Sequence, residues 1–376
     1  SAGLAAIFDD NAVPIKTERT TGYVSDLVSK ANGRFKGAIV SIGHTRWATH
    51  GGVTESNAHP HSSIDGNLSI VHNGIIENTA ELSERVMNLG YKLNSETDSE
   101  LIVHLLHHEL KIQPKDFTPL DALESVVKLL EGSWAIAVIM SGRERILVAR
   151  NGAPIIIGRG HKTICISSDI QPLYGVCTEV SYVNEGDILS IGTDAIESKD
   201  ESRNNDFSPL SGTYEEQDTG LFPHLMIKEI HDQPISLSNS LGGRISPDGA
   251  KTSLGGMALS PEEILKLDRI NIVACGSAFF ASQVGVEIIR EYSDIIVEAF
   301  LASDFPASSV CWENTLTIAV SQSGETKDTL DALQRAKSQG GKISSFCNVV
   351  GSTISRYSGN GAYLHAGPEY AVASTK

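Results

Sequence analysis

Residues 315–337 read TLTIAVSQSGETKDTLDALQRAK, in which an apolar run changes to a polar cluster and then to a helix-forming stretch. An apolar run this short predicts a buried parallel strand at 315–320, followed by a helix at 326–337. Backbone N–H groups at a helix N-terminus are unpaired, and the helix dipole favours an anion there. Further donors come from the side chains of Ser321, Gln322, Ser323 and Thr326.

The polar cluster therefore predicts a phosphate site. Gly324 would let the backbone approach a ligand closely. No lysine lies inside the loop, unlike the nucleotide-binding P-loop, so the loop suits the single phosphate of a small molecule. The alternative is an ordinary strand-to-helix turn in which Thr326 caps the helix.

Strands and helices alternate over the last third of the chain, which predicts a doubly wound α/β parallel sheet with ligands at the carboxyl ends of its strands. The expected strands are 270–274, 295–300, 315–320 and 342–347, and the expected helices are 278–290 and 326–337. Residues 1–192 instead contain mostly short strands and two clear helices, which predicts a layered α+β domain. The polar residues that follow predict a linker, so the expected divisions are 1–192, 193–240 and 241–376.

Composition limits the function. A chain of 376 residues is too long for one ordinary core, and its net charge of −16 argues against nucleic acid and anionic membranes as partners. The absence of an 18-residue apolar run and of a signal peptide predicts a cytoplasmic protein without a transmembrane helix. The five cysteines include no CxxC pair, which predicts buried free thiols.

Polar groups crowd residues 43–51, which read GHTRWATHG. Arg46 offers a planar fork of donors that can hold a carboxylate at two points. Trp47 would form a wall of the site, and Thr49 and His50 would add hydrogen bonds. Packing alone does not explain this density of functional groups.

Three further residues complete a predicted pocket for a free amino acid. Asn73 and Gly74 follow a predicted strand at 68–71, and an amide beside a glycine N–H suits an oxyanion hole; the alternative is a type I′ hairpin turn. Asp98, in the expected capping box at 97–100, could pair with a substrate ammonium or simply cap the helix. The seven histidines at 44, 50, 59, 61, 72, 107 and 108 lack ligand spacing, so no metal site is predicted.

Several segments resemble the glutaminase domain of class II glutamine amidotransferases. They are residues 44–51, 57–61 (NAHPH), 72–78 (HNGIIEN) and 95–98 (SETD). Others resemble the members of that group that carry sugar-isomerase (SIS) domains, namely 182–187 (YVNEGD), 224–234 (HLMIKEIHDQP), 321–326, 347–352 (CNVVGS) and 367–376 (GPEYAVASTK). The resemblance runs from end to end, with the motifs in the order of the family.

This resemblance implies an N-terminal-nucleophile-type glutaminase domain before an SIS domain, and a reaction that makes glucosamine 6-phosphate from L-glutamine and fructose 6-phosphate for amino-sugar synthesis. Arg46, Trp47, Thr49, His50, Gly74 and Asp98 would bind glutamine, and Asn73 and Gly74 would stabilise the oxyanion. Released ammonia would pass through an internal channel to the sugar site. The residues that match sugar-phosphate contacts are Ser277, Ser321, Gln322, Ser323, Thr326, Val372, Ala373 and Ser374. The family needs no metal or organic cofactor and forms homodimers at full length.

The chain also departs from the family. The nucleophilic cysteine should open the mature protein, yet the first cysteine here is Cys165, and roughly thirty residues should precede Ser1 by this comparison. A hydroxyl contact is lost at Ala278, and the second SIS domain is missing. We therefore expect an internal fragment that is inactive alone. The alternatives are a hexose-phosphate sensor with a vestigial glutaminase domain, or a protein in which Ser1 itself is the nucleophile.

Overall fold

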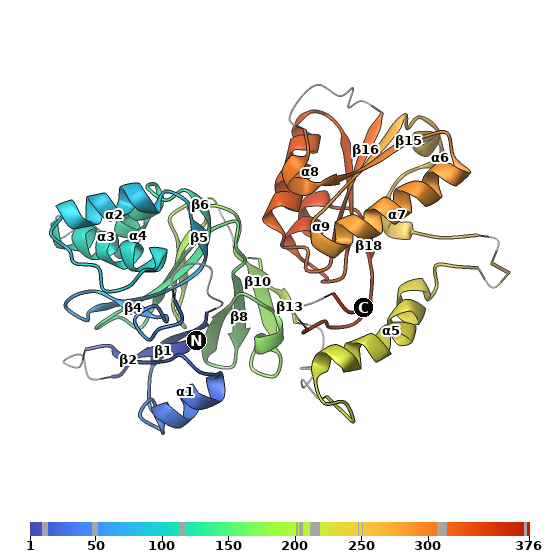
Figure 1. The fold of residues 1–376 in the computed structure, drawn as a ribbon. Helices are drawn as coiled ribbons and strands as arrows, with labels where there is room; N and C mark the ends of the chain where they lie inside the picture. The colour runs from blue at the N-terminus through green and yellow to red at the C-terminus, as the bar shows by residue number, and fades with distance from the viewer. Residues whose placement is uncertain are drawn as a thin grey trace. The chain divides into compact units, whose positions relative to one another are not determined.

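The computed structural model describes residues 1–9, 14–46, 52–112, 117–200, 202, 206–210, 219–246, 248–249, 251–306, 314–371 and 374–376. The chain divides into two compact units, Ser1–Tyr214 and Glu215–Lys376 (Figure 1). The domain limits expected from the sequence, at 192 and 240, remain a prediction.

Within its described residues, the first unit contains three antiparallel sheets. Strands β1 (Ala2–Ile7), β2 (Lys16–Thr20) and β3 (Val40–Thr45) form a sheet of order β2-β1-β3. A six-stranded sheet of order β12-β11-β7-β6-β5-β4 contains β4 (His61–Ser62), β5 (Leu68–Ile76), β6 (Gly132–Met140), β7 (Ile146–Asn151), β11 (Ile188–Ile191) and β12 (Ile196–Ser198). The third sheet, of order β13-β10-β8-β9, contains β8 (Ile156–Gly160), β9 (Thr163–Ser167), β10 (Glu179–Tyr182) and β13 (Ser208–Pro209).

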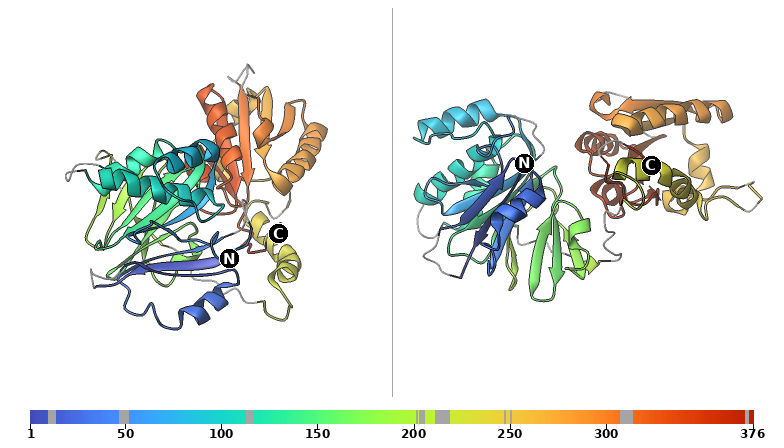
Figure 2. Two further views of the ribbon diagram at one scale, coloured as in Figure 1. Left: turned by 60° about the vertical axis from the view of Figure 1, so that its left-hand side comes forward. Right: turned by 60° about the horizontal axis from the view of Figure 1, so that its bottom comes forward.

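The helices of this unit are α1 (Val24–Ala31), α2 (Thr79–Asn88), α3 (Asp98–Ile112), α4 (Pro119–Val127) and the short 3₁₀ helix η1 (Gln171–Leu173). Helices α2, α3 and α4 cover one face of the six-stranded sheet (Figures 1 and 2). Strand β6 explains this layering, since Trp134, Ile136 and Val138 pack in the helical core. The alternate residues Ala135, Ala137 and Ile139 pack in a second core on the other face. Burial on both faces accounts for a continuous apolar strand, and the predicted layered α+β fold is confirmed.

The second unit is built on a five-stranded parallel sheet of order β15-β14-β16-β17-β18. The strands are β14 (Arg269–Ala274), β15 (Ile296–Leu301), β16 (Thr315–Ser321), β17 (Lys342–Cys347) and β18 (Gly361–Tyr363). The helices are α5 (Leu225–Leu241), α6 (Pro261–Leu265), α7 (Gly276–Tyr292), α8 (Lys327–Ser338), α9 (Thr353–Ser358) and the 3₁₀ turns η2 (Gly255–Met257) and η3 (Ala302–Asp304).

Helices α7 and α8 pack on opposite faces of this sheet. Val286 of α7 packs with Ile272, whereas Leu330 and Leu333 of α8 pack with Val273, the next residue of the same strand. The predicted doubly wound parallel sheet is therefore confirmed. The order of the strands places the reversal between β14 and β16, which is where doubly wound sheets bind ligands.

One local prediction, the capping box at 97–100, was wrong, and one alternative, the hairpin turn at Asn73 and Gly74, is excluded. Asn73 and Gly74 do not form a hairpin turn, because both lie within β5, opposite Ala135 and Trp134 of β6. The capping box at 97–100 does not form either, since the Glu100 carboxylate accepts hydrogen bonds from the backbone N–H groups of Asn94 and Ser95. The N–H group of Thr97 donates instead to Ser95 Oγ.

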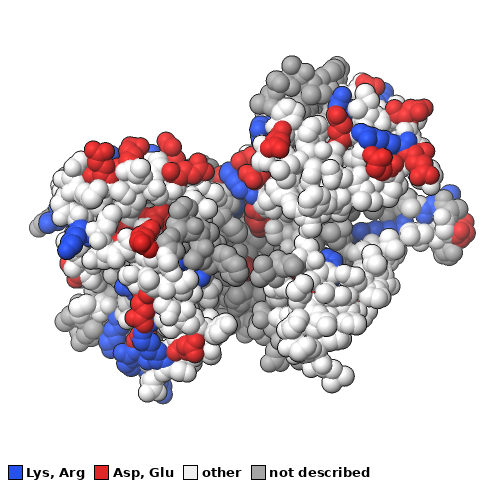
Figure 3. Space-filling model, in the orientation of Figure 1, with Lys and Arg blue, Asp and Glu red and all other residues white. Residues whose placement is uncertain are grey.

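Charge is distributed unevenly on the face of the first unit that Figure 3 shows, where acidic side chains gather over α2. Basic side chains gather near α1, and there Lys30 and Arg34 form ion pairs with Glu18. None of the helices in the described part of the chain is long and apolar enough to cross a membrane.

Candidate functional site

The first unit contains a cavity of about 300 Å³ that brings together four of the residues predicted to bind an amino acid. They are Arg46, Asn73, Gly74 and Asp98. The other residues that line it are His44, Thr45, His59, His72, Ile75, Thr97 and Ser99. The predicted contacts Trp47, Thr49 and His50 lie outside the described residues. The cavity thus offers one guanidinium, one carboxylate and a side-chain amide within a space that suits a small polar molecule.

Strand β5 fixes the amide and glycine side of this cavity. Gly74 has a φ of 121°, a value that side chains other than glycine rarely adopt. A Cβ at this position would lie 2.1 Å from the backbone oxygen of Ser133 on the neighbouring strand β6. Only glycine therefore allows the two strands to pair here and the backbone to leave the regular strand geometry beside Asn73.

Helix α3 supplies the carboxylate. Asp98 is its first residue, and one carboxylate oxygen accepts a hydrogen bond of 3.0 Å from the backbone N–H of Ile76, at the end of β5. The other carboxylate oxygen lies 3.2 Å from Ser99 Oγ and 3.7 Å from His72 Nδ1. These contacts hold the acid against the strand that carries Asn73 and Gly74.

His59 and His72, joined through Ser99, line the cavity. The backbone N–H of His72 donates to His59 Nδ1 at 3.2 Å, which assigns the ring proton of His59 to Nε2. This Nε2 lies 3.2 Å from Ser99 Oγ, and Ser99 Oγ in turn lies 2.8 Å from His72 Nδ1. Hydrogen bonds therefore run from His59 through Ser99 to His72. The remaining ring nitrogen, His72 Nε2, is buried and has no hydrogen-bond partner among the described residues.

Burial keeps these histidines uncharged. It lowers the pKa of His44 to about 4, and the proximity of His72 and Arg46 adds to this shift. It also lowers the pKa of His61, whose ring lies 4.9 Å from that of His59, to about 3. Burial also lowers the pKa of His72, although the nearby Asp98 carboxylate opposes the shift. The described residues contain no group of three histidine, cysteine or acidic side chains placed to hold a metal ion. Near neutral pH the cavity is thus lined by neutral imidazoles, a guanidinium and a carboxylate.

The second unit gathers hydroxyl groups at the carboxyl ends of β14 and β16. Ser277 lies in the first turn of α7, directly after β14, and Ser321 to Thr326 join β16 to α8. The N-termini of α7 and α8 therefore meet at the edge of the sheet where the strand order reverses. Two helix dipoles and several hydroxyls at one edge favour an anion.

Side chains within the loop hold its backbone. Ser321 Oγ accepts from the N–H of Gly324 at 3.0 Å, and Ser323 Oγ accepts from the N–H of Glu325 at 3.2 Å. Gly324 has a φ of 66°, and a Cβ there would lie 2.0 Å from Ser352 Oγ. The turn therefore requires glycine because of its backbone conformation and its approach to Ser352, whereas the predicted approach to a ligand remains a prediction.

Thr326 does not act as an ordinary cap. It occupies the N-cap position of α8, but its side chain makes no capping hydrogen bond. Its hydroxyl lies 3.2 Å from Ser321 Oγ instead, at the start of the loop. This geometry argues against the alternative of a capped strand-to-helix turn.

The structure also joins two distant predicted contacts. Ser277 Oγ and Ser374 Oγ lie 2.5 Å apart, although 97 residues separate them in the sequence. Both residues are exposed. Val372 and Ala373 lie outside the described residues. The described sugar-phosphate candidates therefore come from three segments: the start of α7, the loop 321–326 and the end of the chain.

Sequence reasoning did not identify every residue of these sites. His72 and Ser99 were not proposed as site residues, since they lie 27 positions apart and share no local pattern. The quoted segment 72–78 contained His72, so the family motif was the available signal.

Comparison with known families agrees with this division. Residues 44–175 match the glutamine amidotransferase domain, and residues 263–376 match the SIS domain. Each unit therefore contains a segment similar to one of these two domains.

The relatives are more specific. The chain is 36% identical over 383 residues to the isomerizing glutamine–fructose-6-phosphate aminotransferase of Chlorobaculum tepidum, and 39% identical over 383 residues to that of Idiomarina loihiensis. Each match covers 100% of this chain and 62% of the relative. Among solved structures, the C-terminal domain of the Francisella tularensis enzyme matches 42% of this chain and 44% of that domain's chain, with 32% identity and a TM-score of 0.38. The family resemblance read from the motifs is confirmed: along its whole length the chain is similar to isomerizing glutamine–fructose-6-phosphate aminotransferases, and it spans about 62% of their length.

Proposed function

We propose that this chain is the glutamine-binding part and the first sugar-binding part of an enzyme that transfers the amide nitrogen of L-glutamine to fructose 6-phosphate, yielding glucosamine 6-phosphate and glutamate. The observation that carries the proposal is the cavity of the first unit, which gathers Arg46, Asn73, Gly74 and Asp98. A free amino acid carries a carboxylate and an ammonium, and this cavity holds a charge of opposite sign for each.

In this proposal Arg46 binds the α-carboxylate of glutamine and Asp98 binds its α-ammonium. Asn73 and the backbone of Gly74 then lie beside the side-chain amide, where their N–H groups stabilise the oxyanion of the tetrahedral intermediate. The buried Nε2 of His72 adds a polar atom for which the described residues supply no partner. The attacking thiol belongs to a cysteine in the part of the protein that precedes Ser1.

The sugar half of the reaction is assigned to the edge of the parallel sheet. The hydroxyls of Ser321, Ser323 and Thr326 and the N-terminus of α8 bind the phosphate. Ser277 and Ser374 add hydroxyls on the side of α7. Gln322, Val372 and Ala373 are proposed as further contacts of the sugar by the family resemblance.

Calorimetric titration tests the two halves separately. Titration with fructose 6-phosphate should give heat with the unaltered chain and little with the double variant Ser323→Ala/Thr326→Ala. Equal heats from the two proteins would overturn the sugar assignment. Titration with L-glutamine should likewise lose its heat in Asp98→Asn. D-glutamine serves as the control ligand, because three fixed contacts, at Arg46, at Asp98 and at Asn73 beside the side-chain amide, select one hand.

The complete reaction requires the longer protein. We propose that the full-length enzyme releases glutamate from glutamine in the presence of fructose 6-phosphate, works without a metal or organic cofactor, and acts as a homodimer in the cytoplasm. A reading frame without a cysteine directly after its initiator methionine would contradict the glutaminase half.

A further inference from the structure

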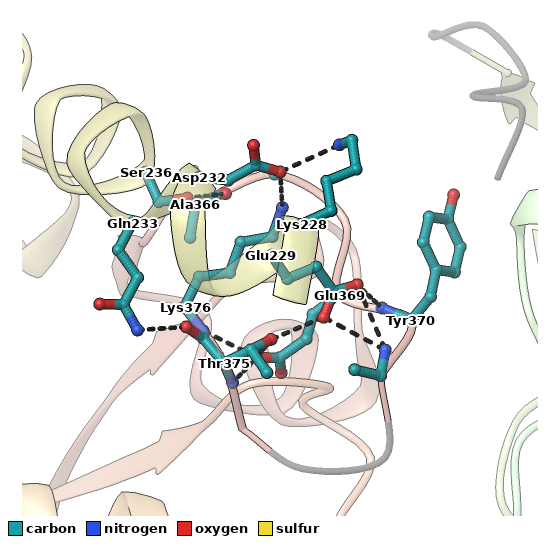
Figure 4. A network of polar contacts seen from close by, with 12 residues as sticks. Lys228, Glu229, Asp232, Gln233, Ser236, Ala366, Glu369, Tyr370, Thr375 and Lys376 are labelled. Atoms are coloured by element: carbon teal, nitrogen blue, oxygen red, sulfur yellow. Dashed lines mark hydrogen bonds and ion pairs between the residues drawn. The ribbon is translucent and has the colours of Figure 1, made fainter. Parts of the chain in front are cut away.

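One face of α5 holds the end of the chain. The face is formed by Lys228, Glu229, Asp232, Gln233 and Ser236, which are spaced about one helical turn apart (Figure 4). Ser236 Oγ donates to the backbone oxygen of Ala366 at 2.8 Å, and the Gln233 amide donates to the backbone oxygen of Thr375. Asp232 lies between two lysines, 3.0 Å from Lys228 Nζ and 3.4 Å from Lys376 Nζ.

Glu229 makes the most contacts of this face. The residue is only 2% exposed. Its carboxylate is nevertheless ionised, and it is surrounded by several hydrogen-bond donors rather than paired with a single cation. It accepts from the backbone N–H of Tyr370 at 2.6 Å, from the backbone N–H of Ala371 at 3.2 Å and from Thr375 Oγ1 at 2.6 Å. Burial raises the pKa of Glu229, but the hydrogen bonds from Thr375, Tyr370 and Ala371 outweigh burial, so the pKa is lowered and the carboxylate stays charged.

A second carboxylate and an amide fix the remainder of the segment. Glu369 accepts from the backbone N–H groups of Thr375 at 2.7 Å and Lys376 at 3.1 Å. At the other end, the Asn348 side chain donates to the backbone oxygen of Gly367 at 2.8 Å and accepts from the N–H of Ala366 at 2.9 Å. The segment before residue 372 is therefore tied to α5 and to Asn348, just after β17, and the segment after residue 373 is tied to α5 and to Glu369.

The consequence falls on Ser374. Its neighbour Thr375 is 3% exposed and is held by its N–H, its hydroxyl and its backbone oxygen. Ser374 itself is exposed and lies 2.5 Å from Ser277, at the edge where the phosphate site is proposed. Fixing Thr375 thus fixes the position from which Ser374 meets Ser277.

We propose that Glu229 is a positioning residue for the sugar-phosphate site: its buried carboxylate holds Tyr370, Ala371 and Thr375 so that Ser374 reaches the Ser277 side of the ligand. The inference rests on the proposed function of the second unit, and it adds a residue that touches no ligand. A neutral amide at position 229 would keep one acceptor but turn an NH₂ group toward the N–H and O–H donors that now bind the carboxylate. The substitution would then displace the segment that carries Ser374, although it removes no side chain that contacts the ligand.

The test uses the 376-residue chain and two pairs of variants. Glu229→Gln is compared with Glu291→Gln, which makes the same change at an exposed position at the end of α7. Thr375→Val, which keeps the shape but removes the hydroxyl, is compared with Thr375→Ser, which retains it. Each protein is titrated with fructose 6-phosphate by calorimetry, and its serine amides are observed by NMR after selective ¹⁵N labelling, without ligand.

We expect Glu229→Gln to weaken binding of fructose 6-phosphate by roughly 10- to 100-fold and Thr375→Val by about tenfold, since hydrogen bonds to a charged group are the stronger ones. The amide resonance of Ser374 should move in both variants. Thr375→Ser and Glu291→Gln should bind within about twofold of the unaltered chain. The Thr375 pair keeps the test valid if Glu229→Gln does not fold.

The outcomes separate the positioning role from the proposed function. If the unaltered chain binds fructose 6-phosphate and both Glu229→Gln and Thr375→Val bind equally well, Glu229 does not position the site and the inference fails alone. If the unaltered chain binds none, the sugar assignment fails and the positioning role fails with it. A shifted Ser374 resonance with unchanged affinity also overturns the inference. The hydrogen bonds of Glu229 would then hold the backbone without any effect on ligand binding.

Discussion

The two candidate sites use opposite means to fix their functional groups. In the first unit, Asn73 and Gly74 lie inside a paired strand, and Asp98 is bonded to the same strand through Ile76. In the second unit, the hydroxyls lie on loops, whose backbone is held by short side-chain bonds such as the one between Ser321 and Gly324. A site built into a sheet is fixed by the fold itself, whereas a site on loops needs dedicated residues such as Glu229 to fix it.

The largest difference should be seen in acid. The neutral histidines of the first unit have lowered pKa values, about 4 for His44 and about 3 for His61, against an ordinary value of 6.5. As the pH falls below 6.5, His44 and His61 bind protons in the unfolded chain but not in the folded unit, so the free energy of unfolding decreases. Each of these two histidines should cost about 2 kcal/mol of unfolding free energy at pH 5 relative to pH 7.

Buried thiols can report on each unit separately. Cys177 is 7% exposed in the first unit and Cys347 is fully buried in the second. Labelling with a disulfide reagent that reacts at pH 5, over a urea series, should show a much lower midpoint for Cys177 at pH 5 than at pH 7. The midpoint for Cys347 should change less, and equal shifts of the two midpoints would remove the proposed contrast.

The substitution Gly74→Ala should have the next largest effect. The φ of 121° and the contact of 2.1 Å with the Ser133 oxygen both oppose a side chain, and we expect a loss of about 3 kcal/mol. Chemical unfolding followed through Cys177 measures it. The matched control is Gly43→Ala in β3, where the nearest atom to a new Cβ is 3.5 Å away and little change is expected. Similar losses in both variants would mean that Gly74 is not specially constrained.

A parallel change in the second unit should cost less. In Gly324→Ala the new Cβ meets the side chain of Ser352 rather than backbone, so part of the clash can be relieved, and we expect a loss of about 2 kcal/mol. Gly285→Ala is the control, because that glycine lies in α7 with no atom within 4 Å of the new Cβ. This control should be stabilised by about 0.5–1 kcal/mol. Far-UV circular dichroism during urea unfolding distinguishes them; a larger loss at Gly324 than at Gly74 would reverse the comparison.

The smallest effect is expected at a helix start. Thr118 caps α4 through a hydrogen bond of 3.2 Å from the Asp121 N–H, whereas Thr326 makes no capping bond to α8. Thr118→Ala should therefore cost about 1 kcal/mol and Thr326→Ala less than about 0.5 kcal/mol. Both are measured by thermal unfolding. Equal costs would restore the reading of residues 321–326 as an ordinary capped turn.

Regular periodicity made the second unit predictable from β14 to β17, whereas α5, α6, α9 and β18 were missed, and α5 lies partly within the expected linker. The strand at 342–347 was predicted without error, and the boundaries of β16 and α8 differ from the prediction by one residue, because strands and helices alternate with clear apolar patterns. Helices α1 and α2 were missed, since only Leu27 is buried in the first and only Leu82 and Val86 are buried in the second. So few buried residues leave little periodicity in the sequence.

At some positions, tertiary contacts override the local preference of the sequence. Asn-Gly favours a tight turn, but pairing with β6 extends β5 through Asn73 and Gly74. The gathering of Arg46, Asn73, Gly74 and Asp98 was predicted from residue chemistry and family motifs together. The bonds of Glu229 were not predictable, because its partners lie 141 to 146 residues away.

That separation has a consequence for biosynthesis. Helix α5 leaves the ribosome long before residues 369–376 are made. The Glu229 carboxylate therefore has no hydrogen-bond donors from this segment while the whole parallel sheet is translated. Until then the carboxylate of Glu229 remains hydrated. Helix α5 lacks its bonds to residues 366–376 and is stabilised mainly by its own backbone hydrogen bonds. Helix α5 can therefore dock only near the end of this stretch of translation, and until then it is open to proteases and to chaperones.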